Sequence, residues 1–289
     1  MKPAPFAYHR ARSVAEAIAL LTELGDEAKI LAGGLSLVPM MNFRLARPTA
    51  LVDVSRLEGL SYLRADAADG LRIGALTTHR TVETSRDPAV LGGFGVLPRS
   101  ARWIGHYPIR SRGTFGGSIA HADPASEWCL LAILLGARVV LTGPGGRRDV
   151  PAAEFFQGYY TTVANPDEMI TELWFPRPEP HAVLTEFAPR QGDFAVVAAA
   201  VALDVRGGVC RSGRVVLGGV GSQPVQVEAG ALGGQPAVPE TWQAMGEHAA
   251  RQIDPPDDTH GDAGFRRRLT VTLVARALAE ASQLPGEQA

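Results

Sequence analysis

Two glycine pairs, each followed by a hydroxyl residue, are the parts of the sequence best suited to holding a ligand. The first segment reads Ala-Gly-Gly-Leu-Ser-Leu-Val-Pro over residues 32–39, and the second reads Thr-Phe-Gly-Gly-Ser over residues 114–118. Glycine has no Cβ, so neighbouring backbone N–H groups can approach an anion, and a hydroxyl adds a further donor. The first segment is equally compatible with a strand-to-helix turn that holds nothing. Two such segments in one chain indicate a ligand with a diphosphate and several hydroxyls.

Other chemistries find less support in the residue types. Neither segment has the Gly-x-Gly-x-x-Gly or Walker A pattern, and the Gly-x-Ser-x-Gly elbow of serine hydrolases is absent. No two histidines have the His-x-x-x-His spacing of a helical metal site. Cys129 and Cys210 are too few for a disulfide framework, or for a four-thiolate cluster built from this chain alone. The candidate residues are therefore expected to bind a ligand rather than to act as acids, bases or nucleophiles.

Composition narrows the class of protein further. The chain has 289 residues, 46% of them hydrophobic, and a formal net charge of -2. Such a chain is too apolar to be disordered and lacks the basic surplus of a nucleic-acid binder. Its apolar runs are too short to span a bilayer, and its start lacks the pattern of a signal peptide. We expect a cytoplasmic protein with no membrane span.

The elements that must position the two segments are partly visible in the pattern. Ser13 and Glu16 form a capping box, which predicts a helix over residues 14–24. A strand over residues 28–32 leads into the first segment, and a helix over residues 124–135 follows the second. Gly207 and Gly208 predict a hairpin between strands at about 194–205 and 209–218. Two helices, at about 240–252 and 263–281, end the chain.

The order of these motifs along the whole chain resembles that of a known family. The motifs lie at residues 32–39, 44–48, 51–54, 114–118, 120–124 and 192–195. They resemble the FAD-binding medium subunit of the molybdenum hydroxylases, the family of the flavoproteins of aerobic carbon monoxide dehydrogenase and of bacterial xanthine dehydrogenase. The resemblance implies that residues 32–39 hold the FAD diphosphate through backbone amides. It also implies that residues 114–118 close on the other side of the diphosphate and ribityl chain.

The same resemblance implies roles for residues outside the two segments. Glu127 would contact the adenosine part, with Asp123 as a nearby candidate, and Ile104 would line the flavin cleft. Met169 or Ile170 would contact the adenine or flavin edge, and an aromatic residue would lie against the isoalloxazine. The full set of predicted FAD-binding residues is Ala32, Gly33, Gly34, Leu35, Ser36, Leu37, Ile104, Thr114, Phe115, Gly116, Gly117, Ser118, Asp123, Glu127, Met169, Ile170 and Phe194.

The sequence also departs from the family pattern at a few positions. Leu35 stands where the family usually has Gln, His or Thr, so one polar contact would be missing. Phe115 and Ser118 replace Ile and Asn in the second segment. Thr185-Glu186 lies where some relatives carry a lysine near the flavin, which leaves the electron acceptor open.

The resemblance implies an α+β fold and a place in a larger enzyme. Two α/β subdomains, about 1–55 and 56–176, would clamp FAD in a domain of residues 1–176. Residues 177–289 would form a C-terminal domain with a three-stranded antiparallel sheet packed by helices.

The implied function is electron transfer within a molybdenum hydroxylase, a cytoplasmic oxidoreductase. FAD would accept electrons from [2Fe–2S] clusters of a small subunit and pass them to an external acceptor, and a large subunit would carry the molybdenum cofactor. The assembly would be a dimer of heterotrimers. A stand-alone FAD oxidase and a flavin-free scaffold remain as alternatives, and neither the substrate nor the acceptor follows from the sequence.

Overall fold

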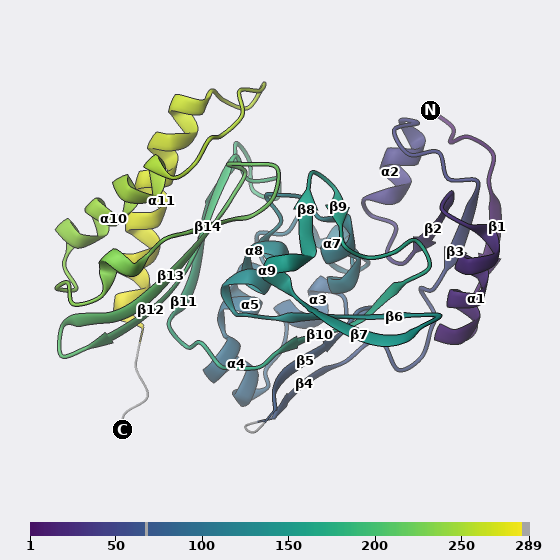
Figure 1. Cartoon of the computed structure of the whole chain (residues 1–289), viewed down its shortest axis with the longest axis horizontal. Helices are drawn as coiled ribbons and strands as arrows, with labels where there is room; N and C mark the ends of the chain where they lie inside the picture. The colour runs from purple at the N-terminus through teal and green to yellow at the C-terminus, as the bar shows by residue number, and fades with distance from the viewer. Residues whose placement is uncertain (67–68, 285–289) are drawn as a thin grey trace.

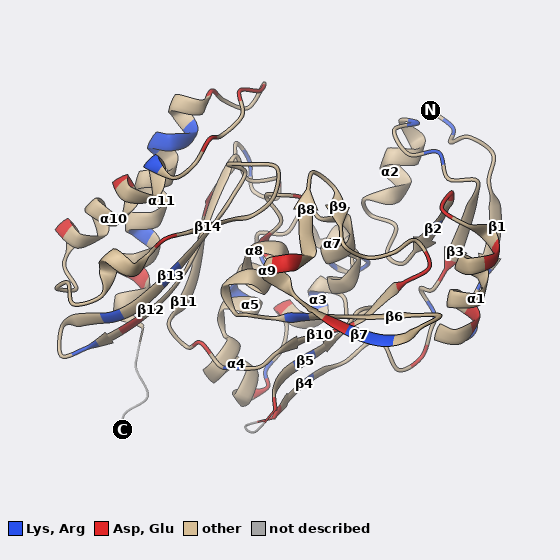
Figure 2. Cartoon of the chain, viewed as in Figure 1, with Lys and Arg blue, Asp and Glu red and all other residues tan. Residues whose placement is uncertain are grey.

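In the described part of the chain, three sheets of three or more strands follow one another along the molecule, in the order of the chain (Figure 1). The structure is a computed structural model and describes residues 1–66 and 69–284. Lys and Arg residues, and Asp and Glu residues, occur in all three parts (Figure 2). Within the described ranges, none of the helices is long and apolar enough to cross a membrane.

The first sheet is a small parallel one. Its strands lie in the order β1 (Ala7–Arg10), β3 (Ala50–Asp53) and β2 (Ala28–Leu31), and its helices are α1 (Val14–Leu24) and α2 (Leu37–Asn42). The capping-box prediction for α1 is confirmed, because the Ser13 hydroxyl accepts from the Glu16 amide and the Glu16 carboxylate accepts from the Arg12 amide. Since the strands are parallel, the chain leaves all three at one edge. The first glycine segment therefore begins beside Asp53.

The second sheet is antiparallel and carries most of the short helices. Its strands lie in the order β4 (Leu63–Asp66), β5 (Gly70–Gly74), β10 (Met169–Phe175), β6 (Arg138–Gly143) and β7 (Gly146–Pro151). The helices around it are α3 (His79–Glu83), α4 (Pro88–Phe94), α5 (Val96–Ser100), α6 (Tyr107–Arg110), α7 (Phe115–His121), α8 (Glu127–Leu134) and α9 (Ala152–Phe155). Strands β8 (Phe156–Gly158) and β9 (Thr161–Thr162) form a separate pair.

Helix α8 begins three residues later than the sequence predicted. Asp123 accepts hydrogen bonds from the Ala125 amide, through its side chain, and from the Ser126 amide, through its carbonyl. This turn holds Pro124 outside the helix, which starts at Glu127. Every residue from Trp128 to Leu134 is buried, because α8 lies between the second sheet and the third.

The C-terminal sheet has four strands, and the prediction of three is wrong. Its order is β11 (Ala182–Phe187), β12 (Val197–Arg206), β13 (Val209–Gly218) and β14 (Val225–Val227), followed by a 3₁₀ turn at Gly230–Leu232, α10 (Pro239–Arg251) and α11 (Ala263–Gln283). The fourth strand is only three residues long, which is too short to show the alternation of apolar and polar residues that indicates a strand. The predicted hairpin is confirmed, since Gly207 and Gly208 both have positive φ, as a two-residue turn of this kind requires.

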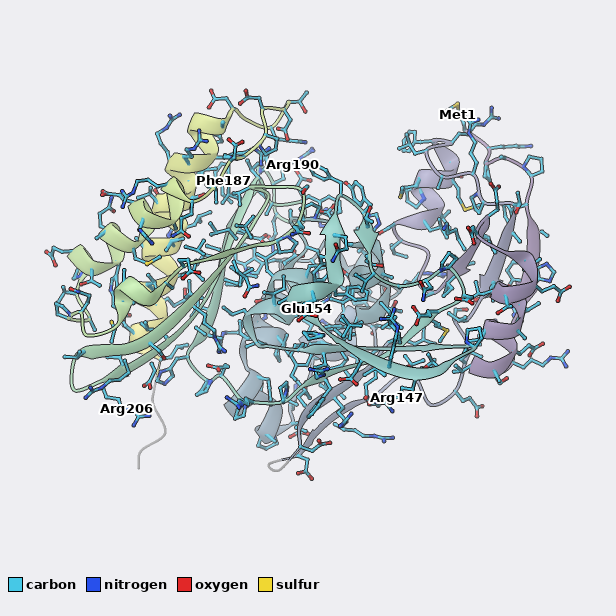
Figure 3. All side chains as sticks on the ribbon, in the orientation of Figure 1. Met1, Arg147, Glu154, Phe187, Arg190 and Arg206 are labelled. Carbon is cyan, nitrogen blue, oxygen red and sulfur yellow. The ribbon has the colours of Figure 1, made fainter. Side chains whose placement is uncertain are left out.

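Strand β12 joins the two main hydrophobic cores, because its side chains alternate between the faces of the sheet. Ala198, Ala200 and Ala202 face the core that contains α8. Val197 and Val201 face α10 and α11. In Figure 3 the side chains of the C-terminal part fill the space between its sheet and these two helices, and Phe187 and Arg190 lie at the end where β11 leaves the sheet.

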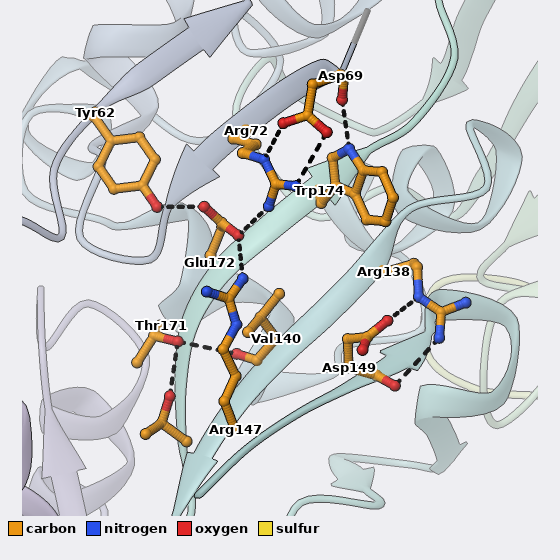
Figure 4. Close-up of polar contacts among 11 residues, drawn as sticks. Tyr62, Asp69, Arg72, Arg138, Val140, Arg147, Asp149, Thr171, Glu172 and Trp174 are labelled. Carbon is orange, nitrogen blue, oxygen red and sulfur yellow. Dashed lines mark hydrogen bonds and ion pairs between the residues drawn. The ribbon is translucent and has the colours of Figure 1, made fainter.

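A polar network stabilises the face of the second sheet (Figure 4). Glu172, on β10, is almost fully buried and accepts from Tyr62, Arg72 and Arg147 at 2.6, 2.7 and 2.7 Å. Burial, followed by the hydrogen bond to Glu172, raises the pKa of Tyr62 to about 12. Because two guanidinium groups and a phenol satisfy the carboxylate, we interpret this cluster as structural.

Candidate functional site

The first glycine segment leaves a run of backbone amides without acceptors. It connects β2 to α2, and the N–H groups of Gly33, Gly34, Leu35 and Ser36 donate to no other group in the part of the chain that the structure describes. Gly34 has a φ of 75°, which a side chain would strain. Successive unpaired amides in a turn form a concave site for an anion. This segment therefore has the local geometry that a diphosphate needs.

The second glycine segment has the opposite hydrogen-bond pattern. The amides of Phe115 and Gly116 donate to the carbonyls of Thr77 and Ala75 at 2.8 and 2.9 Å. The amides of Gly117 and Ser118 donate to the side chain and the carbonyl of Thr114, the N-cap residue of α7. Four of its amides are thus already used. The groups that it can offer a ligand are hydroxyls, of which that of Ser118 also contacts Ser126 at 2.9 Å.

Gly33 in the first segment touches the two residues that immediately precede the second segment. A Cβ on Gly33 would lie 2.3 Å from the carbonyl oxygen of Arg112 and 3.0 Å from the Cα of Gly113. No side chain fits in that space, so glycine at this position permits close approach of the two backbones. Residues 80 positions apart in the sequence thereby form one structure, and this contact joins the parallel sheet to the antiparallel one.

A cavity of about 410 Å³ opens at this junction. It is lined by Leu31, Ala32, Gly33, Gly34, Leu35, Val38, Pro39, Asp53, Ser55 and Arg112. The sequence analysis missed Asp53, Ser55 and Arg112. The signal for the first two was available, because a residue at the carboxyl end of one parallel strand lies beside the loop that leaves the next strand. Ser36 and Leu37, which were predicted, lie at the start of α2 and are not among the lining residues.

Asp53 is the carboxylate of this cavity. Its side chain accepts from the Tyr8 hydroxyl and, at 2.8 Å, from the Ser55 amide, and Arg10 lies 3.9 Å away. Although burial opposes it, these hydrogen bonds lower the pKa of Asp53 below its ordinary value. Asp53 is therefore ionised at neutral pH.

The predicted acidic residues lie beside the second segment, next to the C-terminal sheet. Burial raises the pKa of Asp123, whose carboxylate also bonds to Tyr160. Burial and the neighbouring charge of Glu186 raise the pKa of Glu127. Glu186 lies on β11 and faces α8, because the preceding Thr185 points the other way and bonds to α11 at the Leu273 carbonyl. One carboxylate oxygen of Glu186 is buried without a hydrogen-bond partner among the described residues.

The side chain of Phe115, a predicted FAD contact, points into the protein core. Phe115 is fully buried and stacks on Trp128 with ring centroids 4.5 Å apart. The indole N–H of Trp128 donates to Nδ1 of His79 at 2.9 Å, and burial lowers the pKa of His79 to about 4. His79 lies under the second segment, since a Cβ on Gly113 would lie 2.6 Å from its Nε2. The ring of Phe115 thus supports the segment from below, and a ligand above it could reach only its backbone.

The remaining predicted contacts differ in exposure. Met169 and Ile170 are both buried, but on opposite faces of β10 and in different cores, so their two side chains do not face one ligand together. Ile104 is partly buried against the central core. Phe194 is 68% exposed and lies in the loop between β11 and β12. This loop packs against the residues around the second sheet, because a Cβ on Gly192 would lie within 3 Å of His106, which precedes α6.

The described part of the chain contains no group of three or more His, Cys, Asp or Glu side chains placed to hold a metal ion. Cys129 and Cys210 are both buried as free thiols. Burial raises the pKa of both thiols, which makes them poor nucleophiles.

Comparison with known families shows which family has this architecture. Residues 4–178 match the model of the FAD binding domain in molybdopterin dehydrogenase, and residues 182–281 match that of the CO dehydrogenase flavoprotein C-terminal domain. The chain belongs to this flavoprotein family. It is a FAD-binding oxidoreductase subunit of the molybdenum hydroxylase type, as its resemblance to the medium subunits implied.

The chain is similar over nearly its whole length to proteins of this family. It is 40% identical to the 6-hydroxypseudooxynicotine dehydrogenase complex subunit alpha of Paenarthrobacter nicotinovorans, over 97% of this chain and 96% of the relative. It is 36% identical to the carbon monoxide dehydrogenase medium chain of Hydrogenophaga pseudoflava, over 96% and 97%.

A solved carbon monoxide dehydrogenase from that organism, in a form lacking the Mo-pyranopterin moiety, superposes on this chain with a TM-score of 0.94 at 36% identity, covering 99% of this chain and 100% of that one. The predicted α+β class of the flavoprotein fold is confirmed.

Proposed function

We propose that this chain is the flavoprotein subunit of a three-subunit molybdenum hydroxylase, with a FAD-binding domain at residues 1–176 and a C-terminal flavoprotein domain at residues 177–289. One observation carries the proposal beyond family membership. Four adjacent amides have no acceptor among the described residues, and three of the residues that carry them, Gly33, Gly34 and Leu35, line a 410 Å³ cavity in the domain whose family model is FAD-binding. A concave run of free amides is the kind of site that binds a diphosphate, which favours the flavoprotein over a flavin-free scaffold.

The residues present fit FAD, and each has a defined task. The amides of Gly33, Gly34, Leu35 and Ser36 would donate to the diphosphate, and hydroxyls of the second segment, residues 114–118, would donate to the ribityl chain. Asp123 and Glu127 would accept hydrogen bonds from hydroxyls of the adenosine part, and Ile104, Phe194 and one of Met169 and Ile170 would supply apolar contacts. When bound, FAD supplies electron-carrying chemistry between the iron–sulfur clusters of a small subunit and an external acceptor.

The proposed partners are a large subunit with the molybdenum cofactor and a small iron–sulfur subunit, in a dimer of heterotrimers. The support is that the relatives are named as a complex subunit alpha and as a medium chain. Relatives at 40% and 36% identity carry the names of an enzyme for 6-hydroxypseudooxynicotine and of one for carbon monoxide. Similarity of this subunit therefore does not select a substrate, which agrees with a substrate pocket in another chain. The acceptor stays open, and the cytoplasmic location stays a prediction.

The test is to purify the chain alone and together with its partner subunits. Alone, it should be yellow and release FAD, not FMN, on acid treatment, and it should oxidise no small organic substrate. Co-expression with the large and small subunits should give a stable complex that reduces a dye with substrate. Turnover of a substrate with oxygen by the isolated chain, at about 1–1,000 per second, would instead establish the stand-alone oxidase.

A further inference from the structure

Arg112 contributes to the cavity from outside the segment that forms most of it. Its backbone carbonyl is fixed against Gly33, and the residue lines the cavity together with Gly34 and Leu35. Its side chain forms no hydrogen bond or ion pair with any residue in the described ranges. A residue whose guanidinium has no partner in the described ranges thus lines the cavity together with Gly33, Gly34 and Leu35, although it lies two positions before the second glycine segment.

The other charged groups nearby are already satisfied. Asp53, the carboxylate of the cavity, is held by Tyr8 and the Ser55 amide. Arg110, two residues before Arg112, pairs with Glu83 at 2.9 Å and donates to the carbonyl of Gly105 at 2.8 Å, so its role is to fix the loop. Among the cavity-lining residues that the structure describes, Arg112 is the cation that remains available to a ligand.

We propose that Arg112 neutralises the diphosphate of bound FAD, so that one anion joins the parallel sheet to the antiparallel one. This inference rests on the proposed function. Backbone amides carry only partial charges, whereas a guanidinium brings a full charge and can bind two phosphate oxygens in parallel. Because the amides come from residues 33–36 and the cation from Arg112, binding stabilises the contact between the two segments. Arg112 is therefore a specificity residue for dinucleotides over riboflavin, which has no phosphate.

The experiment compares the apoprotein with three variants by fluorescence titration against FAD and riboflavin at two salt concentrations. Arg112→Gln removes the charge. Arg112→Lys keeps the charge but removes the planar guanidinium that can bind two phosphate oxygens at once. Arg102→Gln is the control, because Arg102 is also exposed but does not line the cavity. We expect Arg112→Gln to bind FAD about 10- to 100-fold more weakly, the range for a hydrogen bond to a charged group. Arg112→Lys should bind with intermediate affinity.

Two further readouts separate a ligand contact from a structural effect. Riboflavin affinity should be unchanged in Arg112→Gln, and the loss of FAD affinity on raising the salt concentration should be smaller than in the wild type, because one ion pair is missing.

Equal FAD affinity in the wild type and Arg112→Gln would overturn this inference alone, as would an equal loss for riboflavin. A wild-type chain that binds no FAD would overturn the proposed function together with it.

Discussion

The contact between Gly33 and Arg112 makes a sharp prediction for the Gly33→Ala variant. The new methyl carbon would lie 2.3 Å from the Arg112 carbonyl oxygen, whereas an ordinary contact is at least 3.4 Å. Both neighbours are backbone, so no side chain can rotate away. The two segments must therefore separate by about 1 Å, and the cavity that they share must change shape.

Two separate losses follow from that displacement. Overpacking of this kind lowers the free energy of unfolding by about 1–3 kcal/mol. The four amides would also move relative to Arg112, so that at least one hydrogen bond to the diphosphate is lost. At about 1.5–3 kcal/mol for a bond to a charged group, FAD affinity should fall about 10- to 100-fold. Gly33 has no positive φ, so the loss is purely steric.

The assay is urea unfolding of the apoprotein together with FAD titration of the folded protein. Gly145→Ala is the matched control, because a Cβ there meets nothing within 4 Å and that glycine also has no positive φ. The control should behave as the wild type in both measurements. Wild-type stability and affinity in Gly33→Ala would show that Gly33 and Arg112 are not in contact.

Three further predictions concern groups around the site. Because the pKa of His79 is depressed to about 4 from an ordinary 6.5, the free energy of unfolding should fall by about 3 kcal/mol as pH drops from 6.5 to 4. In His79→Gln, urea unfolding should show a smaller change of that free energy over the same pH range, and an equal change would contradict the prediction. Phe115→Ala should cost about 3–5 kcal/mol in thermal or urea unfolding, yet leave FAD affinity of the folded protein within a few-fold, unless the ring itself contacts the ligand. The pKa of Glu186 is raised by burial, so stability should fall as pH rises through that pKa, and Glu186→Gln should unfold less readily than the wild type at pH 9 but not at pH 5.

The local elements could be predicted because their causes are local. The helix at Val14–Leu24 follows from its capping box and its apolar period, and the hairpin at Gly207-Gly208 follows from two residues that tolerate positive φ. The three-residue strand β14 could not be predicted, since it exists only through pairing with β13. The start of α8 at Glu127 was missed because the Asp123 side chain competes for backbone amides in a turn.

The sequence by itself determined that the chain has two glycine segments with hydroxyls, and hence the class of ligand. It could not show that the segments differ in what they offer. In the first, four amides have no acceptor among the described residues. In the second, the amides of Phe115 and Gly116 donate to carbonyls just beyond the end of β5, some 40 residues earlier. Hydrogen-bond partners that come from distant strands leave no trace in a local pattern. For the same reason only the tertiary structure placed Arg112 beside Gly33 and Gly34, and so gave the cavity its available positive charge.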